Sequence, residues 1–176
     1  MGDPAVECGD RDRLTRARRP MLIRLIAAGT RLPAWVNEGY RDYAGRLGPE
    51  VRLELREIAV AHRSKNAAID RLRGEEGRHM LGAVNPGMYL GVLDVAGHAL
   101  SSEQLAKWLA QRLADGRDVA LLVGGPDGLD PECLRRAELR WSLSPLTFPH
   151  ALVRLLVAEQ LYRASSILRN HPYHRA

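Results

Sequence analysis

The 176-residue chain has little cysteine, few aromatic residues and no long apolar run. Its two cysteines, Cys8 and Cys133, form neither a disulfide framework nor a CxxC metal motif, which favours a reducing, cytoplasmic environment. Because only three Trp, five Tyr and one Phe are present, a core must consist mostly of aliphatic side chains. No stretch reaches the roughly 18 apolar residues of a membrane-spanning helix, and Arg24 interrupts the apolar run that resembles an export signal.

Lysine is scarce as well, since Lys65 and Lys107 are the only lysines among 26 basic residues. The net charge is +5 and the isoelectric point is about 9.7, which is compatible with a nucleic-acid partner. A strong preference for Arg beside abundant Ala, Leu and Gly is also typical of GC-rich genomes. The charge by itself therefore leaves both interpretations open.

Residues 1–20 mix Asp, Glu and Arg with few apolar side chains. We expect a disordered N-terminal extension, or residues upstream of a true start at Met21, followed by one domain over residues 21–176. Within this domain, apolar patterns predict strands at 21–29, 51–58, 88–95, 118–123 and 140–144. Helical spacing follows each strand, with Ser101 and Gln104 as a capping box and Asp130 as a second cap. The last helix is predicted over residues 149–168.

This alternation predicts an α/β fold with a five-stranded, mostly parallel sheet and helices on both of its faces. The continuous apolar strand at 118–123 is expected in the middle of the sheet. The last helix carries two apolar stripes and therefore needs two burial surfaces. We expect the domain core to supply one surface and a second copy of the chain to supply the other, which predicts a homodimer.

Glycine-rich turns follow two of the predicted strands. The sequence GGPDG follows the strand at 118–123. The strand at 88–95 ends in LDVAG at 93–97, which places Asp94 near its end and Gly97 just past it. In open α/β sheets, ligands bind beyond the carboxyl ends of the strands, and glycine lets the backbone approach a ligand closely. Neither turn contains a dinucleotide or P-loop motif, so each is also compatible with a simple turn.

The segment WSLSPLTFPH at 141–150 leaves the fifth strand between two prolines. Its restricted backbone has polar groups that need partners, which either a rigid connection or a bound polar molecule provides. His150 begins the following helix, where the positive end of the helix dipole favours a neutral imidazole. At the end of the chain, His171 and His174 have HxxH spacing, but no neighbouring carboxylate or thiolate supports a metal site.

Longer motifs resemble one known family. They are VGGPDGL at 123–129, WSLSPLTFPHALVRLLVAEQLYRASSI at 141–167 and NHPYHR at 170–175, with AAGTRLPAWVNEGYRDY at 27–43 and HRSKN at 62–66. From Met21 onward, the chain resembles the ribosomal RNA large subunit methyltransferase H family. Residues 1–20 lie outside the resemblance. The basic loop reads HRSKN where KRGKN is common in the family, so Arg63 and Lys65 retain two charges.

The resemblance implies the SPOUT fold, in which the C-terminal part passes through a loop as a trefoil knot, and a cytoplasmic homodimer. It implies that S-adenosylmethionine serves to methylate N3 of a pseudouridine in 23S ribosomal RNA of the assembled ribosome, without a metal. By motif match, the cofactor is expected to contact Leu93, Gly125, Leu143, Ser144, Pro145, Leu146, Thr147, Phe148 and Pro149.

The implied chemistry requires that the weakly acidic N3–H of the target lose its proton. His174 is the first candidate for a base or substrate positioner, and His150 is the second. Arg175 and Arg154 are candidates for holding a phosphate or the oxygen anion of the ring. Tyr173 is a candidate for stacking on a base. Two alternatives stay open: a SPOUT enzyme that acts on another RNA such as tRNA, and a non-catalytic ribosome-binding factor.

Overall fold

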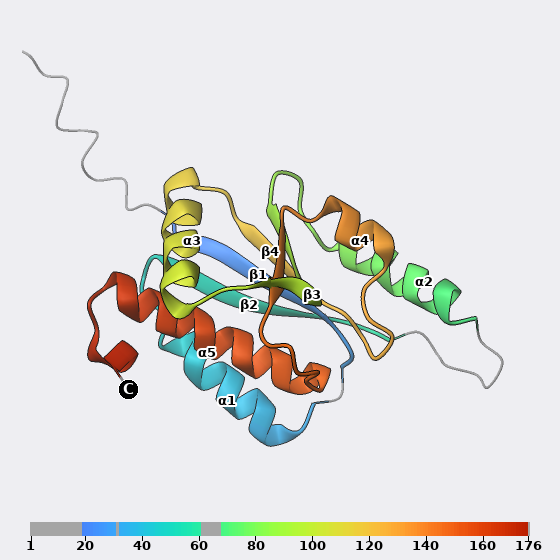
Figure 1. Cartoon of the computed structure of the whole chain (residues 1–176), viewed down its shortest axis with the longest axis horizontal. Helices are drawn as coiled ribbons and strands as arrows, with labels where there is room; N and C mark the ends of the chain where they lie inside the picture. The colour runs from blue at the N-terminus through green and yellow to red at the C-terminus, as the bar shows by residue number, and fades with distance from the viewer. Residues whose placement is uncertain (1–18, 31, 61–67, 176) are drawn as a thin grey trace, which may run out of the picture.

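All five strands run parallel in a single sheet (Figure 1). This computed structural model describes residues 19–30, 32–60 and 68–175, except for the side chains of His174 and Arg175. The strand order is β2-β1-β4-β3-β5, with β1 (Met21–Ala28), β2 (Val51–Ile58), β3 (Tyr89–Ala99), β4 (Val119–Val123) and β5 (Leu139–Ser142). Every residue of β4 is buried at the centre of the sheet, as its apolar sequence predicts.

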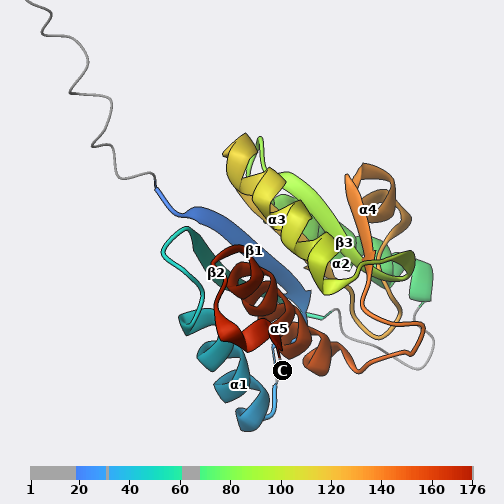
Figure 2. The ribbon, with the colours of Figure 1, turned by 60° about the vertical axis from the view of Figure 1, so that its left-hand side comes forward.

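Helices cover both faces of the sheet, which confirms the predicted α/β architecture (Figures 1 and 2). Successive side chains of a strand point to opposite faces. Ile23 and Leu25 of β1 therefore lie in one hydrophobic cluster, whereas Ile26 and Ala28 lie in the other. The first cluster includes residues of α1 (Ala34–Gly45), α3 (Ser102–Asp115) and α5 (His150–Leu168). The second includes residues of α2 (Ile69–Gly82) and α4 (Pro131–Arg136).

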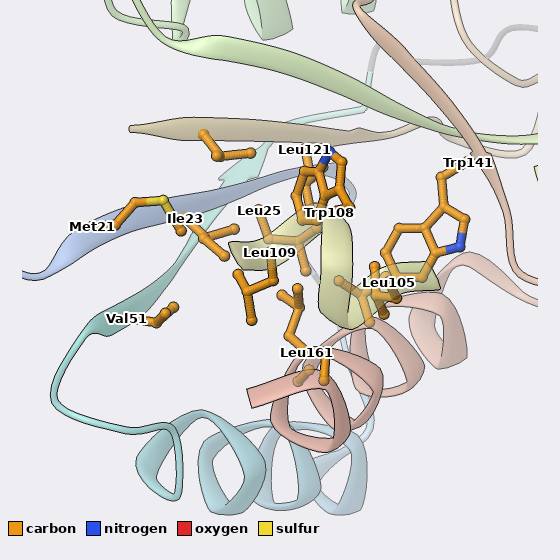
Figure 3. Packing of buried hydrophobic residues seen from close by; sticks show 14 of the residues in the cluster. Met21, Ile23, Leu25, Val51, Leu105, Trp108, Leu109, Leu121, Trp141 and Leu161 are labelled. Carbon is orange, nitrogen blue, oxygen red and sulfur yellow. The ribbon is translucent and has the colours of Figure 1, made fainter. Parts of the chain in front are cut away.

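The larger cluster is aliphatic at its centre, as the shortage of aromatic residues requires (Figure 3). Leu25 and Leu121 of the sheet face Leu105 and Leu109 of α3 and Leu161 of α5, and each of these side chains is at most 1% exposed. Truncating one such leucine to alanine typically costs about 2–5 kcal/mol. This core fixes α3 and α5 against the sheet, and α5 in turn carries one wall of the site described below.

The predicted helix caps are present. The Ser101 hydroxyl accepts a hydrogen bond from the Gln104 backbone N–H at 3.2 Å, and the Gln104 side chain accepts one from the Ser101 N–H at 2.8 Å. Gly116 ends α3 in the left-handed conformation at φ +70°. The Asp130 carboxylate accepts a hydrogen bond from the Glu132 N–H at 2.8 Å and begins α4.

Helix α5 packs against both α1 and α3, so the chain itself provides both of its burial surfaces. On the α1 side, Leu155 lies so close to Gly39 that a Cβ on Gly39 would be 2.9 Å from Leu155 Cδ1. On the other side, Val157 and Leu161 are fully buried in the core that α3 shares. The two apolar stripes therefore have partners within one chain and do not require a second copy. The homodimer stays a prediction.

Two features differ from the predicted elements. Strand β3 continues to Ala99 rather than ending at residue 95, with a register shift against β5 between Leu93 and His98. Gly97 permits this irregularity, because a Cβ there would lie 2.6 Å from the Arg140 carbonyl oxygen. The C-terminal segment also forms a short 3-10 helix, η1 (Pro172–Arg175). The trefoil knot that the resemblance implies stays a prediction.

Candidate functional site

A pocket of about 560 Å³ lies beyond the carboxyl ends of β3, β4 and β5. The turns that follow these strands and the first residues of α5 form its walls. A second hollow, of about 640 Å³, lies at the opposite edge, near Met21 and Asp118, where the strands begin. Because ligands of parallel sheets bind at the carboxyl ends, the first pocket is the candidate site.

The turn after β4 needs glycine at two positions, at Gly124 because of a close backbone contact and at Gly128 because of its backbone conformation. A Cβ on Gly124 would lie 2.7 Å from the carbonyl carbon of Gly128. Gly128 has φ +80° and donates its N–H to the Gly125 carbonyl at 3.0 Å. The segment from Val123 to Leu129 therefore makes a tight turn whose backbone forms part of the pocket wall.

The segment from residue 143 to residue 149 forms the facing wall. The Ser144 hydroxyl accepts a hydrogen bond from the Leu146 N–H at 3.0 Å, and the Ser142 hydroxyl donates to the Ser144 carbonyl at 3.1 Å. Pro149 then precedes α5 with φ −54°. Eight of the nine residues that motif matching assigns to the cofactor line this pocket: Leu93, Gly125, Leu143, Ser144, Leu146, Thr147, Phe148 and Pro149. The ninth, Pro145, lies in the same loop but not on the pocket wall.

Asp94 lies at the pocket, and its carboxylate orders the irregular part of β3 that follows Leu93. It accepts a hydrogen bond from the Ala96 N–H at 3.2 Å and pairs with Arg140 at 2.6 Å. Sequence reasoning missed Arg73 of α2 and Leu134 of α4, which also line the pocket. Neither residue lies in a recognisable motif. Both reach the pocket only through the packing of α2 and α4 on the second face of the sheet, which the sequence does not reveal.

The first turns of α5 place the two predicted residues His150 and Arg154 in different environments. His150 lines the pocket. Arg154 is fully buried and donates to the Glu57 carboxylate at 2.8 Å and to the carbonyls of Ala28 and Gly29 at 2.7 and 2.6 Å. Burial lowers the pKa of the Arg154 guanidinium, and the Glu57 carboxylate opposes that shift. Its guanidinium is thus engaged by groups of the chain itself.

The tail folds back onto the C-terminal half of α5. Asn170, with φ 54°, reverses the chain after the helix. The Tyr173 hydroxyl donates to the Glu159 carboxylate at 3.0 Å, and its ring centroid lies 4.6 Å from that of Tyr162. The Arg163 guanidinium lies 4.9 Å from the Tyr173 ring centroid. Burial, followed by hydrogen bonding to Tyr43 and Glu159, raises the pKa of Tyr173.

Tyr173 and the pocket therefore lie toward opposite ends of α5. Glu159, which binds the Tyr173 hydroxyl, follows His150 by nine positions. At ~1.5 Å per residue, this is roughly 14 Å along the helix axis. The structure brings His150 to the pocket and holds Tyr173 away from it within one chain. For His174 and Arg175 it gives only the backbone, within η1, and their side chains lie outside the description.

Within the part of the chain that the structure describes, no group of three or more His, Cys, Asp or Glu residues is arranged to hold a metal ion. Over the same residues, no helix has both the length and the apolar character to cross a membrane. The basic loop at 62–66, with Arg63 and Lys65, lies outside the described residues.

Comparison with known proteins connects this pocket to a family. A family model described as predicted SPOUT methyltransferase matches residues 21–174. The ribosomal RNA large subunit methyltransferase H of Alkalilimnicola ehrlichii is 60% identical over 156 residues, which cover 89% of this chain and all of that protein. The chain belongs to the ribosomal RNA large subunit methyltransferase H family. The family protein of the same name from Azotobacter vinelandii is 56% identical over 155 residues, covering 88% of this chain and all of the relative.

A solved structure shows the same fold at low sequence identity. A probable methylase family protein from Haemophilus influenzae superposes with a TM-score of 0.50 at 13% identity, covering 86% of this chain and 69% of that one. Together with the match over residues 21–174, this likeness assigns the five-stranded parallel sheet to the SPOUT methyltransferase fold. Methyltransferase H membership also agrees with the motifs that line the pocket, since VGGPDGL and the segment at 141–150 both contribute to it.

Proposed function

We propose that this protein transfers a methyl group from S-adenosylmethionine to N3 of a pseudouridine in the large-subunit ribosomal RNA of the assembled ribosome. The observation that carries the proposal is the pocket beyond β3, β4 and β5, in which eight motif residues from three separate segments meet. Family membership supports the RNA class, because relatives that are 56% and 60% identical are named for the ribosomal RNA large subunit. The net charge of +5 is compatible with an RNA substrate.

The pocket has the size and chemistry that this cofactor requires. A volume of about 560 Å³ lies within the ~300–1,000 Å³ range of small-molecule sites. Leu93, Leu143 and Val153 give it apolar walls for a purine, and Ser144 and Thr147 add hydroxyls. The glycine turn after β4 would hold the cofactor through its backbone. When bound, S-adenosylmethionine supplies a methyl group that its sulfonium makes electrophilic.

The residues of the chain must bind the target base and remove its proton. N3–H of a pseudouridine is weakly acidic, so a base of suitable pKa at the pocket contributes ~10²–10⁴-fold to the rate. His150 lies at the pocket and at the amino end of α5, so its imidazole is a candidate for accepting this proton. His174 is the alternative base, and Arg175 is the candidate, by its charge, for stabilising the oxygen anion of the deprotonated ring.

The position of the tail suggests how His174 and Arg175 meet a pocket. Tyr173 contacts Glu159, roughly 14 Å along α5 from His150 by the helical rise, so this contact holds the tail at a distance from the pocket of its own chain. We infer that the protein works as a homodimer in which the tail of one copy completes the pocket of the other. Because the substrate is the ribosome, we assign the protein to the cytoplasm.

The proposal is tested by methyl transfer from radiolabelled S-adenosylmethionine to assembled ribosomes, isolated subunits and tRNA, with mass spectrometry of the product nucleoside. We expect label on assembled ribosomes, at N3 of a pseudouridine in the large-subunit RNA. Gly124→Ala should abolish cofactor binding, since its Cβ would lie 2.7 Å from the Gly128 backbone. Gly82→Ala is the matched control, because a Cβ there meets nothing within 4 Å.

Two outcomes would contradict the proposal and favour another function. Label on tRNA alone would assign the chain to methylation of another RNA. Ribosome binding without cofactor binding, measured by calorimetry, would assign it to the class of non-catalytic ribosome-binding factors. In either case the Gly124→Ala variant shows whether the pocket takes part, because it changes the turn without changing any charge.

A further inference from the structure

Arg154 is the largest fully buried side chain among the described residues, and it is a cation. Removing a guanidinium from water is costly unless other groups replace its hydration. A helix position that faces the core would ordinarily carry an apolar residue, as Val157 and Leu161 do on the same helix. The position of Arg154 therefore calls for a role that an aliphatic side chain would not perform.

Its contacts join three elements at one edge of the sheet. Nη1 donates to the Glu57 carboxylate, in β2, at 2.8 Å. Nη2 donates to the carbonyls of Ala28, the last residue of β1, and Gly29, which follows it, at 2.7 and 2.6 Å. Gly29 in turn donates its N–H to the Ile58 carbonyl at 2.8 Å. One side chain of α5 thus ties the helix to the carboxyl ends of two adjacent strands.

The position of Arg154 is linked to the pocket through His150, which lines it. Arg154 follows His150 by four residues, so the two side chains lie one helical turn apart on the same face of α5. Gly29 lies between them, since a Cβ on Gly29 would be 3.4 Å from Arg154 Nη2 and 3.4 Å from His150 Nε2. The turn of the chain at Gly29, with φ +100°, is therefore packed against both residues.

We propose that Arg154 is a positioning residue that clamps the first turn of α5 to the ends of β1 and β2 and thereby holds His150 in place at the pocket. This inference rests on the proposed methyl transfer and gives Arg154 a role without contact to the RNA. The planar guanidinium suits the role, because its fork of donors serves a carboxylate on one side and two carbonyls on the other. Lysine would retain the charge but not this geometry.

The first test compares single-turnover methylation of ribosomes, at saturating cofactor, by the wild-type protein and by Arg154→Met and Arg154→Lys. We expect Arg154→Met to lower the rate about 30- to 100-fold, because displacing a reacting group by ~1 Å costs ~10²-fold. Arg154→Lys should recover part of the loss. Ribosome affinity should stay within about twofold of wild type, because Arg154 is buried and does not reach the RNA.

A double-mutant cycle separates positioning from general damage to the fold. If Arg154 acts through His150, Arg154→Met should cost no more than about threefold in a His150→Ala background, because nothing is left to position. An equal loss in both backgrounds would overturn the proposal. Leu161→Ala is the matched control: it truncates a fully buried residue of the same helix, and its effect on the rate should be the same in both backgrounds.

A second measurement does not depend on activity. In proteins labelled at histidine side chains, NMR resonances of the His150 ring, assigned by their loss in His150→Ala, should shift or broaden in Arg154→Met and stay unchanged in Leu161→Ala. Unchanged His150 resonances in Arg154→Met would refute the clamp whatever the enzyme methylates. A wild-type protein without methyl transfer, but with the shifted resonances in Arg154→Met, would instead refute the proposed function and leave the clamp standing.

Discussion

Gly29 is the residue at which backbone conformation and the candidate site meet most directly. Its φ of +100° lies in the region that favours glycine, and the space where a Cβ would stand is bounded by Arg154 and His150. Gly29→Ala should therefore lower the free energy of unfolding by about 1–2 kcal/mol through backbone strain. It should also slow methyl transfer, because the strained turn lies in van der Waals contact with both side chains.

The control for this prediction is Gly116→Ala. Gly116 has a comparable φ of +70°, but a Cβ there meets nothing within 4 Å and the residue lies at the opposite edge of the sheet. Chemical denaturation of both variants should show similar destabilisation, while single-turnover kinetics should show a loss in Gly29→Ala alone. Equal rates in the two variants would mean that the contacts at Gly29 do not reach the chemistry.

At the scale of single residues, local motifs were predictable and long-range contacts were not. Ser101 and Asp130 were identified as caps because a cap is recognised over three or four residues of sequence. Arg154, in contrast, looked like a phosphate ligand, because the sequence does not reveal that Glu57 and the end of β1 surround it. Its partners lie about 100 residues away in the chain.

At the scale of elements, α5 shows where periodicity stops being informative. Two apolar stripes correctly indicate two burial surfaces, but the pattern does not say whether the second surface belongs to the same chain. Here α1 provides it, through contacts such as that of Leu155 with Gly39. The bounds of the strands were predicted closely, except at β3, where the register shift beside the pocket lengthens the strand beyond its apolar run.

The loop from residue 143 to residue 149 gives a prediction at the element scale. Pro149 lines the pocket and fixes the backbone where α5 begins. Replacing a proline by alanine at a compatible site restores conformational freedom worth about 0.4–1 kcal/mol. If cofactor binding must then order the loop, calorimetry should show a dissociation constant about twofold to fivefold higher for Pro149→Ala. Pro49→Ala, at the opposite edge of the sheet, should leave the cofactor affinity unchanged.

At the scale of the whole molecule, the order of strands places the site. Alternation of strands and helices predicts a parallel sheet but not the order β2-β1-β4-β3-β5, which brings the ends of β3, β4 and β5 together. The family motifs nevertheless identified the site, because eight of the nine residues that they assign to the cofactor line the pocket. The tail was harder to place from sequence, since its partners Tyr43, Glu159 and Tyr162 come from two helices.

The tail gives the last prediction. Because the tail carries the candidate residues His174 and Arg175, and Tyr173 holds it on α5 away from the cofactor pocket, we expect deletion of residues 171–176 to abolish methylation while cofactor binding and dimerisation persist. Mixed dimers then identify which pocket the tail serves. A tail-deleted subunit paired with a Gly124→Ala subunit has one intact pocket and one intact tail on different chains, so a tail that serves its partner restores about half of the wild-type rate. A tail that serves its own pocket restores none, and a deletion that yields monomers would make the tail a structural element of the dimer.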